Sequence, residues 1–288
     1  MDNIQYYLFL IFKEAIKYTP KRLEPIIISI FFKLLYNKKF ARKKIVLKNL
    51  EIAFPDLNQE EREELAKDVY RKYLGYFADI VKSMNISKDS LKQKVTIRGQ
   101  ENLEKVLNSD KPIIFMTAHF GNWEIAPKVI GAFYKPMVVL MREFDNPKIG
   151  DFFKQSRASF NITPIDKNGS AREILRAFKS GKALGVLIDQ HTSSSKAIEV
   201  DFFNQKVKFN RSISTFADKF GAVVIPMFSY LEDDKYILEF LEPKTFEGCT
   251  VESFTQWQAT TIENMIKKHP SEYYWFHKRF KNRKGTYS

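Results

Sequence analysis

A chain of 288 residues with 44% hydrophobic residues, 26 phenylalanines among them, is long enough to bury a full core, which excludes general disorder. Its formal net charge of +13 indicates an anionic partner, such as nucleic acid, acidic lipid head groups or an acidic protein. The single cysteine, Cys249, excludes an internal disulfide framework and is typical of a reducing cytoplasm, and no HExxH or CxxC spacing indicates a metal site.

Two apolar runs open the chain, residues 4–12 and 26–36, and charged residues such as Lys13 and Lys17 lie between them. Neither run reaches the roughly 18–20 apolar residues that a membrane-spanning helix needs, and no cleavage site for a signal peptide follows. We therefore expect residues 1–37 to form membrane-associated helices that lie in one leaflet, with lysines extended toward the head groups. Two buried core helices, or one strained span by the first run, are the alternatives.

The next part of the chain, up to residue 94, is expected to be a helical scaffold. One helix should end near Phe54, because Pro55 cannot continue it. Asn58, followed three residues later by Glu61, is typical of a helix N-terminus with a capping box. An apolar stripe at helical spacing predicts the helix that follows, formed by Leu65, Val69, Tyr73, Phe77 and Ile80.

From residue 95 onward, short apolar runs alternate with amphipathic ones. We expect strands at 95–98, 112–118, 137–142, 162–166, 183–189, 222–229 and 235–241. We expect helices at 101–108, 123–133, 147–159, 169–180, 209–220, 251–268 and 271–281. Gly181 and Gly221 are expected in left-handed conformations that end two of these helices. The alternation predicts an α/β fold with a largely parallel central sheet flanked by helices.

The segment "HFGNWE" begins at His119, just beyond the expected strand 112–118. In parallel sheets, reactive groups gather at the carboxyl ends of strands, in the loops that lead to helices. Asn122 is expected to cap a helix that starts at Trp123, which places Glu124 in its first turn. Five positions along a helix correspond to roughly 140° around its axis, so a tight turn is needed to bring this carboxylate back onto the imidazole.

A histidine held by a carboxylate is suited to general base catalysis. The carboxylate fixes the tautomer, and the free ring nitrogen takes a proton from an attacking hydroxyl. No serine or cysteine is obviously placed as a nucleophile beside His119, so the simplest chemistry is direct attack by a substrate hydroxyl on an activated acyl carbonyl. A purely structural histidine at the end of a strand is the alternative.

The segment "HFGNWE" resembles the HxxxxD/E motif of the bacterial lipid A biosynthesis acyltransferases, the late lauroyl and myristoyl transferases within the lysophospholipid acyltransferase-like group. Further blocks resemble the same family in the same order: "KNLEIAFPDLNQEEREELAKDVYRKYLGYFADI", "VVLMREFDNP" with "QSRASFNITPID", "ALGVLIDQH" through "AVVIPMF", and "EYYWFHKRFKNRKG". The resemblance implies a glycerol-3-phosphate acyltransferase-like α/β domain over residues 38–288, preceded by the membrane-associated segment.

The resemblance also implies roles for individual residues. His119 is expected to be the general base for a hydroxyl of the lipid acceptor, with Glu124 holding its ring. A further set is expected to steady the oxyanion or bind substrate: Arg157, ranked first, Arg142, Asp189 and Asn122. The loop "QHTSSSKAIE" departs from the glycine-bearing loop of the family, and His191 within it is interpreted as polar surface.

The family's donor is an acyl thioester on acyl carrier protein, which is acidic, and its acceptor is a phosphorylated lipid A precursor. The positive charge therefore has a use, because a cationic surface steers both substrates. Phosphate contacts are expected from the basic end of the chain, at Lys278, Arg279, Lys281 and Arg283. No cofactor and no metal are expected, and the implied location is the cytoplasmic face of the cell inner membrane.

Two other functions are compatible with parts of this pattern. The same histidine site serves an acyltransferase for another membrane lipid, such as a lysophospholipid, an ornithine lipid or a glycolipid, because the pair does not read what carries the hydroxyl. A non-catalytic basic protein that binds membrane or nucleic acid accounts for the charge. It leaves "HFGNWE" without a purpose, and the chain has no nucleic-acid-binding motif.

Overall fold

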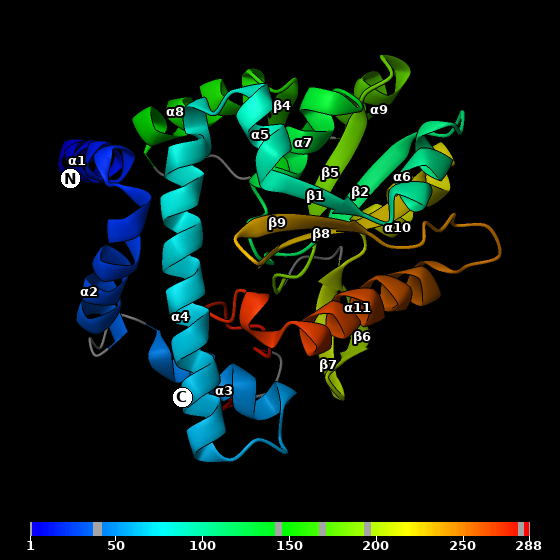
Figure 1. Cartoon of the computed structure of the whole chain (residues 1–288). Coiled ribbons are helices and arrows are strands. Elements are labelled where there is room, and N and C mark those ends of the chain that lie inside the picture. The colour runs from blue at the N-terminus through cyan, green and yellow to red at the C-terminus, as the bar shows by residue number, and fades with distance from the viewer. Residues whose placement is uncertain are drawn as a thin grey trace.

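The computed structural model describes residues 2–36, 42–141, 146–166, 171–192, 197–281 and 285–287. Within them a seven-stranded sheet has the order β1-β9-β8-β2-β5-β3-β4 (Figure 1). The strands are β1 Val95–Arg98, β2 Ile113–Thr117, β3 Met137–Met141, β4 Ile162–Asp166, β5 Ala183–Leu187, β8 Val223–Glu232 and β9 Lys235–Phe240. Strands β8 to β4 run parallel to one another, whereas β9 is antiparallel to β8 and β1 is parallel to β9. The predicted α/β class and largely parallel sheet are confirmed.

Helices cover both faces of this sheet, which explains why its central strands are continuous apolar runs. Along β2, Ile113 and Phe115 pack with one buried cluster, and Ile114 and Met116 pack with the other. The helices with buried residues in the first cluster are α4 Gln59–Lys82, through Tyr76 alone, α5 Lys88–Lys94, α6 Gln100–Leu107 and α7 Ile125–Phe133. Those in the second are α2 Glu24–Tyr36, through Tyr36 alone, α3 Lys43–Ala53, α4, α9 Ala171–Lys179, α10 Ser212–Phe220 and α11 Val251–Lys268.

The long helix α4 begins and packs as its sequence predicts. The Asn58 side chain accepts hydrogen bonds from the backbone N–H groups of Glu60 and Glu61, and Glu61 accepts one in return, which is the predicted capping box. Val69 and Ile80 of the apolar stripe are buried, whereas Phe77 is 50% exposed. Helix α3 ends at Ala53, before the proline, as expected.

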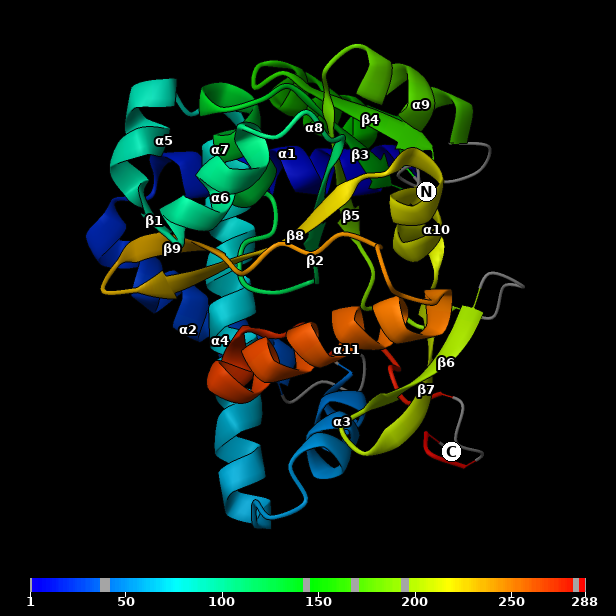
Figure 2. The ribbon, with the colours of Figure 1, turned by 90° about the vertical axis from the view of Figure 1, so that its right-hand side faces the viewer.

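A β-hairpin was not among the expected elements. Strands β6 Ala197–Phe202 and β7 Gln205–Asn210 pair in an antiparallel ribbon beside α11 (Figure 2). The two residues between them, Phe203 and Asn204, have φ of 51° and 55°, the left-handed pair that a two-residue hairpin turn requires. The helix expected at 209–220 therefore starts later, at Ser212.

The helix expected at 271–281 is wrong. After a single 3-10 turn at Pro270–Glu272, the chain runs alongside the loop that follows β2. The Gly121 N–H donates to the Glu272 carbonyl at 2.7 Å, and the Tyr274 N–H donates to the His119 carbonyl at 2.9 Å. These bonds between distant segments take the place of a helical ladder and bring the C-terminal segment to the histidine.

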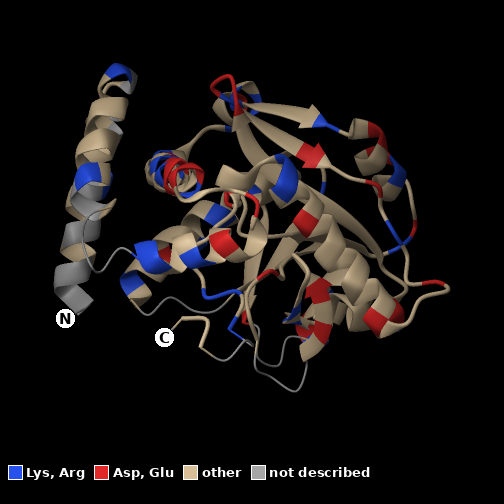
Figure 3. Cartoon of the chain, turned by 90° about the horizontal axis from the view of Figure 1, so that it is seen from below, with Lys and Arg blue, Asp and Glu red and all other residues tan. Residues whose placement is uncertain are grey.

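The first two helices, α1 Asp2–Tyr18 and α2 Glu24–Tyr36, lie on the outer side of α4, away from the sheet (Figures 1 and 3). Of the helices that the structure describes, none is long and apolar enough to cross a membrane. Helix α1 contacts α4 and α8 Pro147–Ala158, and its Ile16 is buried there. Several large apolar side chains of this pair and of the 3-10 turn between the two helices are exposed instead of buried: Tyr7, Ile11, Tyr18, Leu23, Ile26 and Ile30.

Candidate active site

The loop after β2 is pressed against β8, and Gly121 makes this possible. Its φ is +53°, and a Cβ at this position would lie 1.8 Å from the Ser229 carbonyl oxygen. A side chain therefore does not fit, and the chain turns sharply where the sequence predicts. The turn leaves His119 at the carboxyl end of β2, with 22% of its side chain exposed.

Asp189 is the carboxylate that holds the imidazole. Strand β5, which ends at Leu187, is the direct neighbour of β2, so the loops beyond the two strands lie side by side. His119 Nδ1 lies 2.9 Å from Asp189 Oδ1, and the His119 backbone N–H donates to the same oxygen at 3.0 Å. The carboxylate is thus bonded to both the ring and the backbone of one residue.

The buried position of Asp189, which is 2% exposed, has two opposing effects on its ionisation. Burial is the largest influence on its pKa and raises it, but the nearby imidazole and the hydrogen bonds from His119 outweigh burial, and they hold the pKa of Asp189 below its usual value. An ionised Asp189 accepts a hydrogen bond from Nδ1–H, so the neutral imidazole carries its proton on Nδ1 and its lone pair on Nε2.

The predicted contact between Glu124 and His119 is not what the structure shows. Glu124 adopts a right-handed helical conformation directly before α7, so its side chain turns toward α8 instead of folding back onto the imidazole. There it receives two hydrogen bonds from Arg157, at 2.5 Å from Nη2 and 3.2 Å from Nε. The two side chains are only 9% and 12% exposed, and they form a bidentate ion pair.

Asn122 differs from its prediction in both of its expected roles. Helix α7 begins at Ile125, with Glu124 at the N-cap position, so Asn122 does not cap it. Its side chain is fully buried and donates to the Tyr236 hydroxyl at 3.2 Å, while its carbonyl accepts from Ser229 Oγ at 2.6 Å. Asn122 therefore fastens the loop to β8 and β9, and as a buried group it does not face a substrate.

Aromatic rings surround the exposed side of the histidine. The Trp123 and Tyr274 rings lie with their centroids 5.1 Å and 6.1 Å from that of His119. Tyr73 of α4 packs against both rings, and its hydroxyl donates to the carbonyls of His119 and Glu272 at 3.2 Å and 2.7 Å. These contacts fix the backbone on either side of the imidazole and give the site an apolar wall.

The Glu272 carboxylate secures the C-terminal segment to α4. It is 1% exposed, and it is bonded by the Tyr76 hydroxyl and the Lys72 ammonium group. Neither Glu272 nor Tyr73 was singled out from the sequence as part of a site, because the expected helix at 271–281 placed this segment elsewhere. One sequence feature could have indicated them: Tyr73 and Tyr76 place two hydroxyl groups on the sheet-facing side of a strongly predicted helix.

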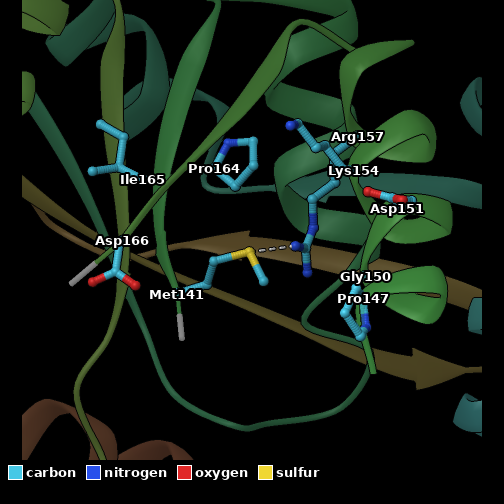
Figure 4. Close-up of a pocket in the computed structure, with 9 residues that line it drawn as sticks. All are labelled: Met141, Pro147, Gly150, Asp151, Lys154, Arg157, Pro164, Ile165 and Asp166. Carbon is cyan, nitrogen blue, oxygen red and sulfur yellow. Dashed lines mark hydrogen bonds between the residues drawn. The ribbon is translucent and has the colours of Figure 1, made fainter. Parts of the chain in front are cut away.

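A cavity of about 300 Å³ opens at the carboxyl ends of β3 and β4 (Figure 4). Arg157 borders it, and its Nη1 lies 2.7 Å from Met141 Sδ. The other lining residues are Pro147, Gly150, Asp151, Lys154, Pro164, Ile165 and Asp166. Arg157 therefore has one side on the carboxylate and the other on an open space that mixes apolar and charged groups.

The expected phosphate contacts at the basic end of the chain do not share one environment. Arg283 lies outside the described residues, as does Arg142 of the expected oxyanion or substrate-binding set. Lys278 and Lys281 are exposed, whereas Arg279 is only 1% exposed. Its Nη1 donates to the Lys208 carbonyl at 3.0 Å, and its guanidinium stacks over a phenylalanine ring of β7, so Arg279 does not join the two exposed lysines.

His191, interpreted from the sequence as polar surface, is half-buried, and its backbone N–H donates to Nε2 of His277 at 3.0 Å. Burial is the main cause that lowers the pKa of His277, to about 4, so this imidazole is neutral near pH 7 and able to accept. Among the described residues, no group of three or more histidine, cysteine, aspartate or glutamate side chains is arranged to hold a metal ion.

Comparisons with known proteins give consistent results. Residues 1–282 match the model of the family described as bacterial lipid A biosynthesis acyltransferase. Lipid A biosynthesis acyltransferase 2 of Shigella flexneri is 21% identical over 85% of this chain and 79% of its own length. The palmitoleoyltransferase and the lauroyltransferase of lipid A biosynthesis in Escherichia coli are 23% and 22% identical, each over 84% of this chain and over 79% and 80% of their own. A solved acyltransferase for 1-acyl-sn-glycerophosphate from Thermotoga maritima is 15% identical, with a TM-score of 0.41 over 86% of this chain and 97% of its own.

Proposed function

The chain belongs to the bacterial lipid A biosynthesis acyltransferase family, and we propose that it transfers an acyl chain from an acyl carrier protein thioester to a hydroxyl of a phosphorylated lipid A precursor. One observation carries the proposal. A buried carboxylate, Asp189, occupies Nδ1 of a partly exposed histidine, His119, and leaves Nε2 at the rim of the sheet. This is the arrangement that a general base for a hydroxyl requires.

In the proposed reaction, His119 Nε2 takes the proton of the acceptor hydroxyl as the hydroxyl oxygen attacks the thioester carbonyl carbon. Asp189 stabilises the imidazolium that forms, since the two groups are 2.9 Å apart. When the tetrahedral intermediate collapses, the carbonyl is restored, the thiolate leaves, and the imidazolium returns a proton to the sulfur. General base catalysis of this kind typically contributes about 10²–10⁴-fold in rate.

We assign Glu124 to the positioning of Arg157 instead of His119. The bidentate pair holds the guanidinium at the border of the cavity, with both side chains largely removed from water. A fixed guanidinium at a cavity mouth is suited to bind a phosphate or the acceptor's acyl amide and ester oxygens. Arg142 keeps its proposed role in acceptor binding, although it lies outside the described residues. Lys278 and Lys281 keep the proposed phosphate contacts, because both are exposed.

We place the protein at the cytoplasmic face of the inner membrane, anchored by α1 and α2 as interfacial helices. Ile11, Ile26 and Ile30 are 67%, 57% and 53% exposed, which is unusual for isoleucine in water and is explained if a lipid leaflet covers them. The net charge of +13 supports attraction to anionic head groups and to an acidic carrier protein on the same side of the membrane.

The test is an in vitro transfer assay with purified protein, a panel of acyl carrier protein thioesters, and two classes of acceptor. A tetraacylated lipid A precursor and a lysophospholipid are offered separately, and products are identified by mass spectrometry. The proposal expects acylation of the lipid A precursor. Acylation of the lysophospholipid alone would refute the assigned acceptor, while leaving the chain an acyltransferase.

A further inference from the structure

Gln190 follows Asp189 directly, and its side-chain amide lies against the reactive nitrogen of the site. Gln190 Nε2 is 3.3 Å from His119 Nε2. Because Nδ1–H donates a hydrogen bond to Asp189, Nε2 of the neutral ring is an acceptor, and the group facing it must be a donor. The amide therefore presents its N–H to the lone pair that the acceptor hydroxyl has to reach.

The backbone around Gln190 is anchored on both sides. The preceding Asp189 carboxylate is fixed by the ring and the backbone N–H of His119. The following residue, His191, donates its backbone N–H to His277 at 3.0 Å. A side chain between two such anchors is exposed to solvent yet has its first atoms held in place. Its amide is thus able to swing over a short distance without leaving the site.

The reaction needs a donor for the negative charge that develops on the carbonyl oxygen, and several donors of the neighbouring residues already have partners. The backbone N–H groups of His119 and Gly121 are bonded to Asp189 and Glu272. The Arg157 Nε and Nη2 groups are bonded to Glu124. The Gln190 amide is different, because its partner in the resting site, His119 Nε2, is the atom that the acceptor hydroxyl must bond. The arriving hydroxyl therefore frees the amide for another acceptor.

We propose that the Gln190 amide is the oxyanion donor of this acyltransferase, an inference that rests on the proposed function. In the resting site the amide occupies the place of the acceptor hydroxyl on His119 Nε2. When the hydroxyl binds, the amide is displaced toward the thioester. The new C–O bond then forms, the hydroxyl proton moves to Nε2, the carbonyl electron pair moves to the oxygen, and the Gln190 N–H donates to that oxygen until the thiolate leaves.

The test compares Gln190→Ala, Gln190→Glu and Gln190→Asn with a control, Gln93→Ala, which replaces an exposed glutamine of α5 remote from the described site residues. Two rates are measured for each protein: acyl transfer to the lipid A precursor, and release of thiol from the acyl carrier protein thioester with water as the acceptor. Thermal unfolding confirms that each variant is folded.

For Gln190→Ala we expect kcat to fall about 100-fold in both assays, the typical loss for one oxyanion donor, with KM values within about threefold of the wild type. Gln190→Glu is expected to lose at least as much, since a carboxylate of the same size has no N–H and repels the oxyanion. Gln190→Asn is expected to retain more activity than either, and Gln93→Ala to match the wild type.

A kcat for Gln190→Ala within threefold of the wild type, or a rise in KM without a fall in kcat, overturns the assignment. If the wild type releases thiol but does not acylate the precursor, the proposed acceptor is wrong. In that case the thiol-release rates still decide the role of Gln190. If the wild type has neither activity, the proposed function and this assignment fall together.

Discussion

Replacing Asp189 by asparagine tests whether Asp189 or Glu124 is the carboxylate that assists His119. The asparagine keeps the shape of the side chain and removes its charge. The imidazolium that forms during catalysis then loses an ionised partner at 2.9 Å. With an effective dielectric constant of about 20, that interaction is worth roughly 5–6 kcal/mol at this separation. At about 1.4 kcal/mol per tenfold change in rate, the expected loss in kcat is about 10⁴-fold.

The matched variant is Glu124→Gln, which removes the charge that pairs with Arg157. Both side chains are mostly buried, so the uncompensated guanidinium is expected to lower the free energy of unfolding by about 2 kcal/mol, somewhat less than for a fully buried pair. Because the imidazole keeps its own partner, Glu124→Gln is expected to raise the KM for the acceptor more than it lowers kcat.

Steady-state transfer kinetics and urea unfolding of both variants decide between the two carboxylates. If Asp189→Asn keeps more than a tenth of the wild-type kcat while Glu124→Gln abolishes turnover without losing stability, the assignment is reversed. Glu124 would then be the partner of His119 during catalysis, as the resemblance of "HFGNWE" to the family motif implied.

Three further predictions concern the loop, the pH dependence and the membrane. Gly121→Ala should lower the free energy of unfolding by more than about 2 kcal/mol, because its Cβ meets the Ser229 carbonyl oxygen at 1.8 Å. Gly181→Ala, with φ of +73° and no atom within 4 Å of its Cβ, should cost only about 1–2 kcal/mol for the left-handed backbone. Equal losses of the two variants in urea unfolding contradict the clash. The pKa of His277 is about 4 in the folded protein and about 6.5 in the unfolded chain, so between these pH values only the unfolded chain binds the extra proton. The free energy of unfolding should therefore fall by about 2 kcal/mol, after allowance for partial exposure, as the pH drops from 6.5 to 4. A His277→Gln variant that shows the same pH dependence refutes the assignment of this loss to His277. A variant that combines Ile26→Lys with Ile30→Lys should cosediment with anionic vesicles at least about 10-fold less than the wild type. The control Leu231→Lys, which changes another exposed apolar residue, should bind like the wild type. Equal binding by the wild type and both variants rules out α2 as the anchor.

The parts of the fold that depend on local sequence were predictable. Helix α11 has the predicted bounds, and the expected strand at 162–166 is β4. The apolar run before His119 forms the central strand of the sheet, and the Asn58 capping box is present, because both signals arise within a few residues of the chain.

The partner of His119 was not predictable in this way. Asp189 is 70 residues away in sequence, and it reaches the imidazole only because β5 lies beside β2 in the sheet. The spacing of one short motif favoured Glu124, although helical geometry already placed it on a different side. In the same way, the bonds of the 272–274 segment to the loop after β2 override the helical pattern of its residues.

The most direct test of the account is the mass of the lipid product formed by the wild type and by His119→Ala. Each purified protein is incubated with an acyl carrier protein thioester and the tetraacylated lipid A precursor. The account predicts that the wild type adds an acyl chain to the precursor, and that His119→Ala adds none although it still folds, as a cooperative thermal unfolding transition shows. A folded His119→Ala protein that acylates the precursor at the wild-type rate would contradict it.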